Sequence, residues 1–179
     1  TAMPVLVPNR SVPSDKVIVF SGNSFTELAI LTSCFHYWWA ISTCGTLRDD
    51  LSYSPRDCLD TLPLPLPAPG SETIWESAEA GMATAGRRLH EFREDLLFRA
   101  GRGLTKTYNR VHDRNDSSVD IVQLRELHAQ LDRCVRDAYG WSDIELGHGH
   151  WETPQGERFT VSSDARDELL DRLLELNHI

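Results

Sequence analysis

Residues able to do chemistry are sparse in this sequence, and few have the spacing of a metal or nucleotide site. His148 and His150 lie two residues apart and could reach one metal ion, but no third ligand follows at a suitable spacing. The segment AGRGLTKT resembles a phosphate-binding loop, yet Thr105 rather than glycine precedes Lys106. We therefore expect no metal site and no nucleotide loop, and turn histidines at 148 and 150.

Nucleophilic and cofactor chemistry also lack a motif. There is no G-x-S-x-G and no credible Ser/His/Asp order. The triplets GRG and GHG do not follow a strand, so neither indicates a dinucleotide or S-adenosylmethionine site. The lysines, Lys16 and Lys106, do not end a D/E-x-K triplet, so a nuclease centre of that type has no candidate. We expect no catalytic and no cofactor-binding residue in this chain.

Composition narrows the class of protein. The 179 residues carry a formal net charge of −9, which argues against a chain that coats nucleic acid over its whole surface but permits a local basic patch. The apolar run 25–41 is interrupted by polar residues and is too short to span a membrane. Four cysteines match no zinc spacing and are expected to be free thiols of a cytoplasmic protein: Cys34, Cys44, Cys58 and Cys134. We expect the chain to be a piece of a longer protein.

Basic residues concentrate between positions 86 and 110. That stretch contains seven basic residues, Arg87, Arg88, Arg93, Arg99, Arg102, Lys106 and Arg110. It contains only three acidic residues, Glu91, Glu94 and Asp95. Such a strip on an acidic protein is typical of a surface that faces phosphate. A solvated helix face with interleaved Arg–Glu pairs explains the pattern as well.

The segment SCFHYWWA, residues 33–40, packs aromatic side chains into little more than one helical turn. Ser24 and Glu27 form an S-x-x-E capping box, and apolar residues then recur every three or four positions, which predicts one helix ending near Gly45. Apolar groups on the other faces favour a helix surrounded by protein. Stacking of one of these rings on an extruded base is the alternative.

The remaining elements predict a mainly α fold with a small β part (α+β), in which short strands and a buried helix precede a small helical bundle. MPVLVP and KVIVFS are expected strands, and the proline-rich run LPLPLPAPG is a stiff linker or, less simply, an SH3-type ligand. We divide the chain into residues 1–67, a linker at 68–71 and a helical domain at 72–179. Later helices are expected at 72–100, 104–111, from Ser117 to Gly140 and from Ser163 onward, with a strand at 158–161.

The string SCFHYWWAISTCGTLRDDLSYSPRDCLDTLPLP resembles the end of the target-recognition region in fused DNA adenine methyltransferases of type II restriction–modification and related phage-defence systems. That family's pattern reads roughly S-x-x-F-H-x-x-W-A, a turn, R-Y-S or similar, and an F-P-x-P exit. Ser33 is displaced by one residue, whereas these positions match: Phe35, His36, Trp39, Ala40, Tyr53 and Ser54, with LPLP at 62–65 for the exit. GLTKTYNRVHD, LRELHAQLDRCVRDAYGW, RFTVS and LLELNH resemble the helical C-terminal segment of the same enzymes.

The resemblance implies a role in an enzyme whose catalytic part lies elsewhere. Such enzymes bind S-adenosylmethionine and methylate adenine N6 through an N-P-P-Y-type motif, which this sequence lacks, so both are expected upstream or in a partner chain. The present chain would position duplex DNA and contact a methyltransferase core, with no membrane association. A helical scaffold that docks such a core without touching DNA is the alternative.

Site residues follow from the same resemblance together with the charge pattern. His36 and Trp39 are expected to be structural, because they belong to the helix that anchors the recognition loops. The turn after that helix supplies the expected DNA contacts Arg48, Tyr53 and Arg56. Arg102, Lys106 and Arg110 are the expected phosphate contacts.

Overall fold

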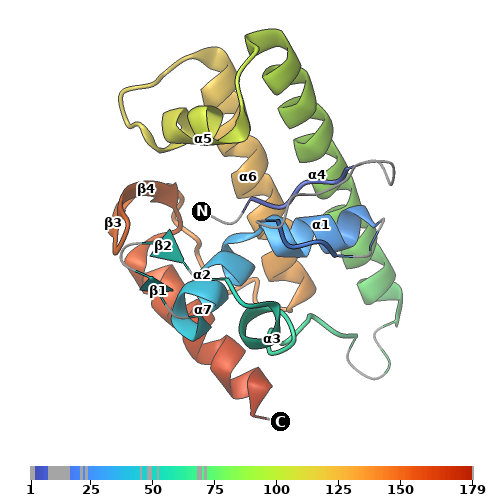
Figure 1. The fold of residues 1–179 in the computed structure, drawn as a ribbon. Coiled ribbons are helices and arrows are strands. Elements are labelled where there is room, and N and C mark those ends of the chain that lie inside the picture. Colours follow the sequence, from blue (N-terminus) through green and yellow to red (C-terminus); the bar gives the residue numbers. More distant parts are fainter. Residues whose placement is uncertain are drawn as a thin grey trace.

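The computed structural model describes residues 3–7, 17–20, 22, 24–44, 46–47, 50–51, 53–67, 70 and 72–178. Within these residues the chain is mostly helical with two short antiparallel hairpins, so the predicted fold class is confirmed (Figure 1). The elements in chain order are α1 (Phe25–Thr32), α2 (Cys34–Thr43), β1 (Thr46–Leu47), β2 (Asp50–Leu51), α3 (Pro55–Cys58), α4 (Glu72–Ala100), α5 (Leu104–His112), α6 (Val119–Ala138), β3 (Gly149–Thr153), β4 (Gly156–Thr160) and α7 (Ser163–Asn177).

The predicted aromatic helix begins as expected but consists of two helices. Ser24 and Glu27 form the capping box, with Ser24 Oγ accepting from the Thr26 amide at 3.1 Å. The chain then breaks at Ser33, whose extended backbone ends α1 and caps α2. The Cys34 amide at the new amino end donates to Asp132 Oδ1 at 2.8 Å, so a distant carboxylate stabilises the break. Local periodicity carries no sign of such a partner, which is why one helix was predicted.

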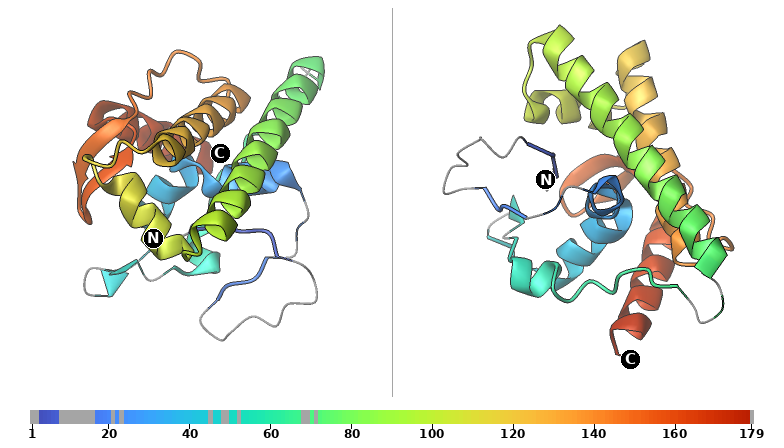
Figure 2. Two further views of the ribbon diagram at one scale, coloured as in Figure 1. Left: turned by 90° about the horizontal axis from the view of Figure 1, so that it is seen from above. Right: turned by 90° about the vertical axis from the view of Figure 1, so that its right-hand side faces the viewer.

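One hydrophobic core joins the residues before and after the proline-rich run. Phe35 and Trp39 of α2 are buried in the same core as Leu89 of α4, Leu131 of α6 and Leu173 of α7. The long helices α4 and α6 lie side by side, and α1 crosses α4 closely (Figures 1 and 2). At that crossing a Cβ atom on residue 86 would clash with the carbonyl oxygen of Phe25, so only Gly86 permits the approach.

The β part differs from its prediction. Residues 3–7 and 17–20 form no strand, so the strands predicted at MPVLVP and KVIVFS are wrong in these described positions. The Pro4 carbonyl instead accepts a hydrogen bond from Arg93 at 2.7 Å, which ties the segment to a helix rather than to a sheet. The strand predicted at 158–161 is β4, two residues earlier, and pairs with β3, where a turn was expected.

Two cysteines also depart from expectation. Cys44 and Cys58 are joined as a disulfide with their Cα atoms 6.0 Å apart, a normal separation for this bond, so the prediction of free thiols is wrong for this pair. The bridge connects the end of α2 to α3, which meet only through folding of the intervening hairpin. Cys34 and Cys134 are free thiols. No helix in the described part of the chain is long and apolar enough to cross a membrane.

Candidate functional site

A hydrogen-bonded pair, His36 and Tyr53, fixes the chain at the end of the β1–β2 hairpin. His36 is buried in α2, and its Nδ1 donates to the Leu31 carbonyl at 2.7 Å. The neutral ring therefore accepts at Nε2, where the Tyr53 hydroxyl donates at 2.7 Å. Burial lowers the pKa of His36 and raises the pKa of Tyr53, which keeps both groups neutral at pH 7. The pair fixes the chain just after the hairpin on α2.

Trp39 and the Cys44–Cys58 disulfide connect α2 to the segment around α3. The Trp39 indole is 1% exposed and donates to Thr61 Oγ1 at 3.1 Å, below α3. A ring so enclosed has no face left for a base. Arg56 lies exposed on α3, whereas Arg48 lies outside the described residues. Of the three predicted contacts of this turn, the structure therefore presents Arg56 to solvent and holds the Tyr53 hydroxyl in a hydrogen bond.

The amino end of α5 presents two free basic side chains. Arg102 and Lys106 are exposed and form no ion pair with any described residue. Gly103 caps the helix without a side-chain hydrogen bond, so no capping side chain satisfies the first backbone amides of α5 beside these two cations. Amides, helix dipole and positive side chains together are suited to an anionic oxygen.

Arg110 differs from these two residues, because a carboxylate already neutralises it. Its Nε donates to Asp116 Oδ2 at 2.7 Å, and a second nitrogen donates to Ser118 Oγ at 2.7 Å. The hydrogen bonds from Arg110 and then Ser118 lower the pKa of Asp116 to about 2. This arginine is therefore less available to a phosphate than its predicted companions.

The rest of the predicted basic strip is dispersed over α4. Arg93 is buried, Arg99 pairs with Asp95 and Asp120, and Arg87 lies over the Phe25 ring at 4.6 Å. Arg88 faces a groove between α4 and α6. A run that is continuous in sequence therefore does not form one continuous surface, because successive helical residues point 100° apart.

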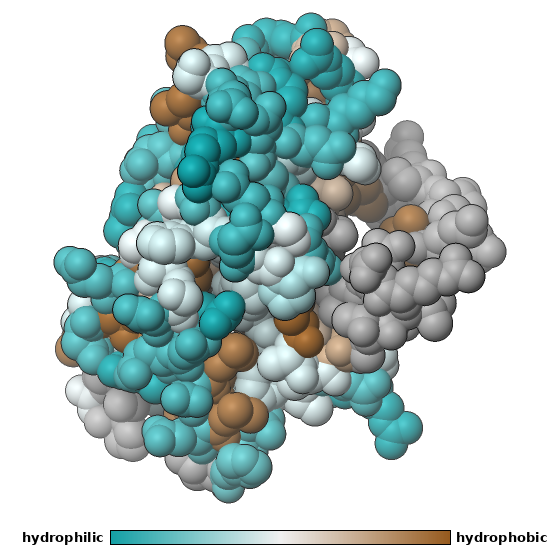
Figure 3. All heavy atoms as spheres, turned by 90° about the vertical axis from the view of Figure 1, so that its left-hand side faces the viewer, coloured by the Kyte–Doolittle hydropathy of each residue, from teal (hydrophilic) through white to brown (hydrophobic). Residues whose placement is uncertain are grey.

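The two groups of predicted residues lie far apart but face the same side. α5 is at the upper end of the molecule and α3 at the lower end, with the first residues of the chain between them (Figure 1). Both elements lie on the left in the side view of Figure 2, the side that faces the reader in Figure 1. The face beside the β3–β4 hairpin is mostly hydrophilic, with only small separate hydrophobic groups in view (Figure 3).

Polar side chains that sequence reasoning took as isolated meet inside the molecule. His148 donates to Asp132 at 2.8 Å, and Arg93, His112, His128 and Arg158 line the same pocket. Among the described residues no group of three or more His, Cys, Asp or Glu side chains could hold a metal ion. A buried arginine within an amphipathic helix, such as Arg93 on the stripe of α4, is the one sequence signal that could have pointed here.

Comparison with known proteins shows what this chain is similar to. Residues 3–66 match the family model described as the MmeI target recognition domain. No curated protein matches the sequence. The structure is similar to the Type IIL restriction–modification enzyme MmeI, solved in complex with DNA, at a TM-score of 0.55 and 17% identity. The match covers 89% of this chain and 17% of that one, so the chain spans about a sixth of that enzyme. The expected resemblance is thus confirmed: the chain is similar to the MmeI target recognition domain over residues 3–66 and shares over most of its length the fold of part of a Type IIL restriction–modification enzyme.

Proposed function

We propose that this chain is a non-catalytic portion of a DNA adenine methyltransferase of a restriction–modification or phage-defence system, and that it positions and helps recognise duplex DNA. The match of residues 3–66 to the MmeI target recognition domain carries the proposal. The catalytic core and its S-adenosylmethionine site would lie in another part of the parent protein or in a partner chain, in the cytoplasm with the DNA.

The amino end of α5 supplies the proposed backbone contacts. Arg102 and Lys106 are exposed beside amides that no capping side chain satisfies, so a phosphate there would exchange its counterions for fixed positive charge. Arg110 contributes less, because Asp116 already holds its guanidinium. Arg56 on α3 would contact the duplex at the other end of the same side of the molecule, and Arg48, which lies outside the described residues, is the further contact proposed for this turn.

Tyr53 acts in this proposal mainly by position. Its hydroxyl is used by His36, so the residue fixes the start of α3 relative to α2 and leaves only its ring for contact. His36 and Trp39 support the hairpin from within the core and do not touch DNA. Sequence readout would then fall to hairpin side chains, since base edges rather than phosphates carry sequence information.

The alternative is a scaffold that docks a methyltransferase core without DNA contact. The net charge of −9 favours it, as do the ion pairs that occupy several arginines: Arg99, Arg110, Arg114, Arg133, Arg136, Arg166 and Arg172. Seven of the 18 Lys and Arg side chains are thus paired with the protein's own carboxylates and are less available to phosphate.

Fluorescence anisotropy on a random duplex, at two salt concentrations, separates the two functions. We expect weak binding that decreases with salt, and weaker binding with a smaller salt slope in Arg102→Glu/Lys106→Glu. Each lost phosphate contact lowers the slope by nearly one unit, so the double variant should lose about 2 units.

A matched charge reversal on another surface is the control. Arg88 lies in the groove between α4 and α6. The substitution Arg88→Glu changes the net charge by as much as Lys106→Glu alone. Equal losses in these two single variants would show a non-specific effect of net charge. No binding of the wild-type chain at low salt would overturn the proposal and leave the scaffold function.

A further inference from the structure

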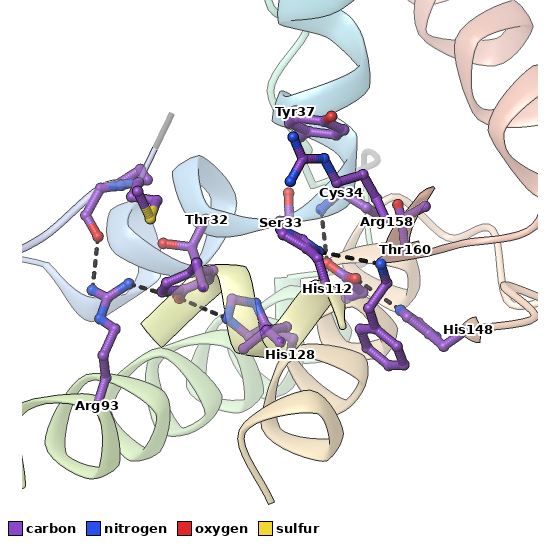
Figure 4. A pocket seen from close by; sticks show the side chains of 16 residues that line it. Thr32, Ser33, Cys34, Tyr37, Arg93, His112, His128, His148, Arg158 and Thr160 are labelled. Atoms are coloured by element: carbon purple, nitrogen blue, oxygen red, sulfur yellow. Dashed lines mark hydrogen bonds and ion pairs between the residues drawn. The ribbon is translucent and has the colours of Figure 1, made fainter. Parts of the chain in front are cut away.

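A small pocket lies where α1 meets α2, with α4, α5, α6 and β4 around it (Figure 4). Its volume is about 90 Å³, several times the ~10–15 Å³ that one water molecule needs in the same measure. The wall combines aromatic surface from Tyr37 and Phe159 with an unusual number of polar groups from separate elements. The pocket is therefore large enough for a group of four or five heavy atoms.

Each oxygen of the one carboxylate in the wall already accepts a hydrogen bond from the protein. Asp132 Oδ1 accepts from the Cys34 amide at 2.8 Å, and its Oδ2 accepts from His148 Nε2 at 2.8 Å. Both partners are fixed groups, the first at a helix amino end and the second on the segment before β3. Asp132 is thus held by these two donors and forms no hydrogen bond with the unpaired donors around the pocket.

Those other donors lack acceptors. His112 Nδ1 accepts from the Phe159 amide at 3.2 Å, so the neutral ring carries its hydrogen on Nε2. That Nε2 atom, the Arg158 Nε and the Thr32 hydroxyl are buried and bond to no described residue. Each of the three can donate, and burying a donor without an acceptor costs free energy.

The charged groups around the pocket also include more donors than acidic partners for them. Arg93 is 1% exposed and donates to the Tyr108 hydroxyl at 3.3 Å and to the Pro4 carbonyl, both neutral groups. The Tyr108 hydroxyl in turn donates to His128 Nε2 at 2.8 Å. Arg158 comes from β4 on a different side (Figure 4), and neither arginine forms an ion pair within the described part of the chain. Two guanidinium groups therefore face a pocket with a single carboxylate.

We propose that this pocket binds a small oxyanion of the phosphate or sulfate type, held by hydrogen bonds from Arg158 and His112, with Thr32 and Arg93 in another part of the wall, where Arg93 adds positive charge. An oxyanion only accepts hydrogen bonds, which is what a wall of unpaired donors requires. The site does not depend on the proposed function. Its ligand is either a free inorganic anion or a phosphate of a nucleic-acid backbone, which share this chemistry.

Calorimetric titration of the wild-type chain with inorganic phosphate, at constant ionic strength in chloride, tests the site. We expect saturable binding of one anion per chain and a matching rise in the thermal unfolding temperature. Arg158→Gln and His112→Asn should each weaken phosphate binding about tenfold or more, because each removes a buried donor to a charged acceptor. The asparagine keeps an acceptor for the Phe159 amide, so its fold is preserved.

Arg88→Gln is the matched control, since it removes an exposed arginine in the groove between α4 and α6, outside this pocket, and should leave phosphate binding unchanged. A duplex titration distinguishes the sources: Arg158→Gln weakens duplex binding only if the anion is a backbone phosphate. Wild-type protein that binds phosphate no better than chloride would overturn the site, whatever the variants do. Equal loss in Arg88→Gln and Arg158→Gln would also overturn it, and neither result bears on the charge-reversal test of DNA binding by α5.

Discussion

The aromatic helix α2 and the amino end of α5 differ in the exposure of their most notable side chains. The large aromatic residues of α2 are buried, whereas the basic residues at the end of α5 are exposed. α2 contains the most conspicuous residues of the sequence, yet Phe35, Trp38 and Trp39 are almost completely buried. Arg102 and Lys106 stand in an unremarkable stretch, yet both reach solvent without a partner among the described residues. Large aromatic side chains most often pack in the core, whereas an exposed cation without an ion-pair partner is available to a ligand.

The largest effect that tests this division is expected from Trp39→Ala. Removing the indole leaves a cavity in the core and removes the donor to Thr61 Oγ1, which still donates to the Asp57 carbonyl, so unfolding free energy should fall by about 3–5 kcal/mol. Urea unfolding followed by circular dichroism measures it. Trp151→Ala is the control, because that indole is 41% exposed on β3 and its removal should cost about 1 kcal/mol or less.

A base-stacking role for Trp39 would give a different result. The variant would then keep its stability and lose affinity for an extruded base in a duplex with a mismatch. If Trp39→Ala and Trp151→Ala destabilise equally, the division between a structural α2 and an exposed α5 fails.

Residue patterns predicted much of the fold because the governing interactions are local. The capping box at Ser24 and the apolar stripe of α4 lie within a few residues, and both elements begin where the sequence placed them. The break at Ser33 depends on Asp132, which is 98 residues from Cys34, and no local pattern encodes such a partner. The Cys44–Cys58 bridge likewise joins two different elements, at a sequence separation of 14.

The candidate site was predictable only in part for the same reason. Exposure of Lys106 follows from its helix and charge, but pairing of Arg110 with Asp116 depends on the turn between α5 and α6. The polar pocket was missed altogether, since the residues that line it come from seven separate segments of the chain. Each of those residues, taken singly, looks like an ordinary helical or turn residue.

Acidification is expected to have the next largest effect. Burial lowers the pKa of His128 to about 4, and burial with the nearby Arg158 lowers that of His112 to about 4. The unfolded chain binds protons near pH 6.5, so the stability gained from keeping both rings neutral is complete above that pH and is lost as the pH falls toward 4. Between pH 7 and pH 5 the loss should be on the order of 2–4 kcal/mol.

Thermal unfolding at pH 7 and pH 5 measures this loss in the wild type and in His128→Gln. Glutamine keeps an acceptor for the Tyr108 hydroxyl but cannot be protonated, so the difference between the two pH values should be about halved. An unfolding temperature equal at both pH values would show that these rings are protonated in the folded protein. The buried part of the molecule would then tolerate charge as well as the end of α5 does.

The smallest effect is expected from Tyr53→Phe, which tests the boundary between the two regions. The variant leaves buried His36 Nε2 without its donor, so stability should fall by about 1 kcal/mol, and the loss should vanish in a His36→Leu background. Duplex affinity should fall slightly with an unchanged salt slope, because a neutral hydroxyl bound to His36 displaces no counterion. A large loss of duplex affinity with unchanged stability and an unchanged salt slope would place the Tyr53 hydroxyl on DNA. The hairpin end of the molecule would then contact DNA through the same residue that anchors it, and the contrast with α5 would not hold there.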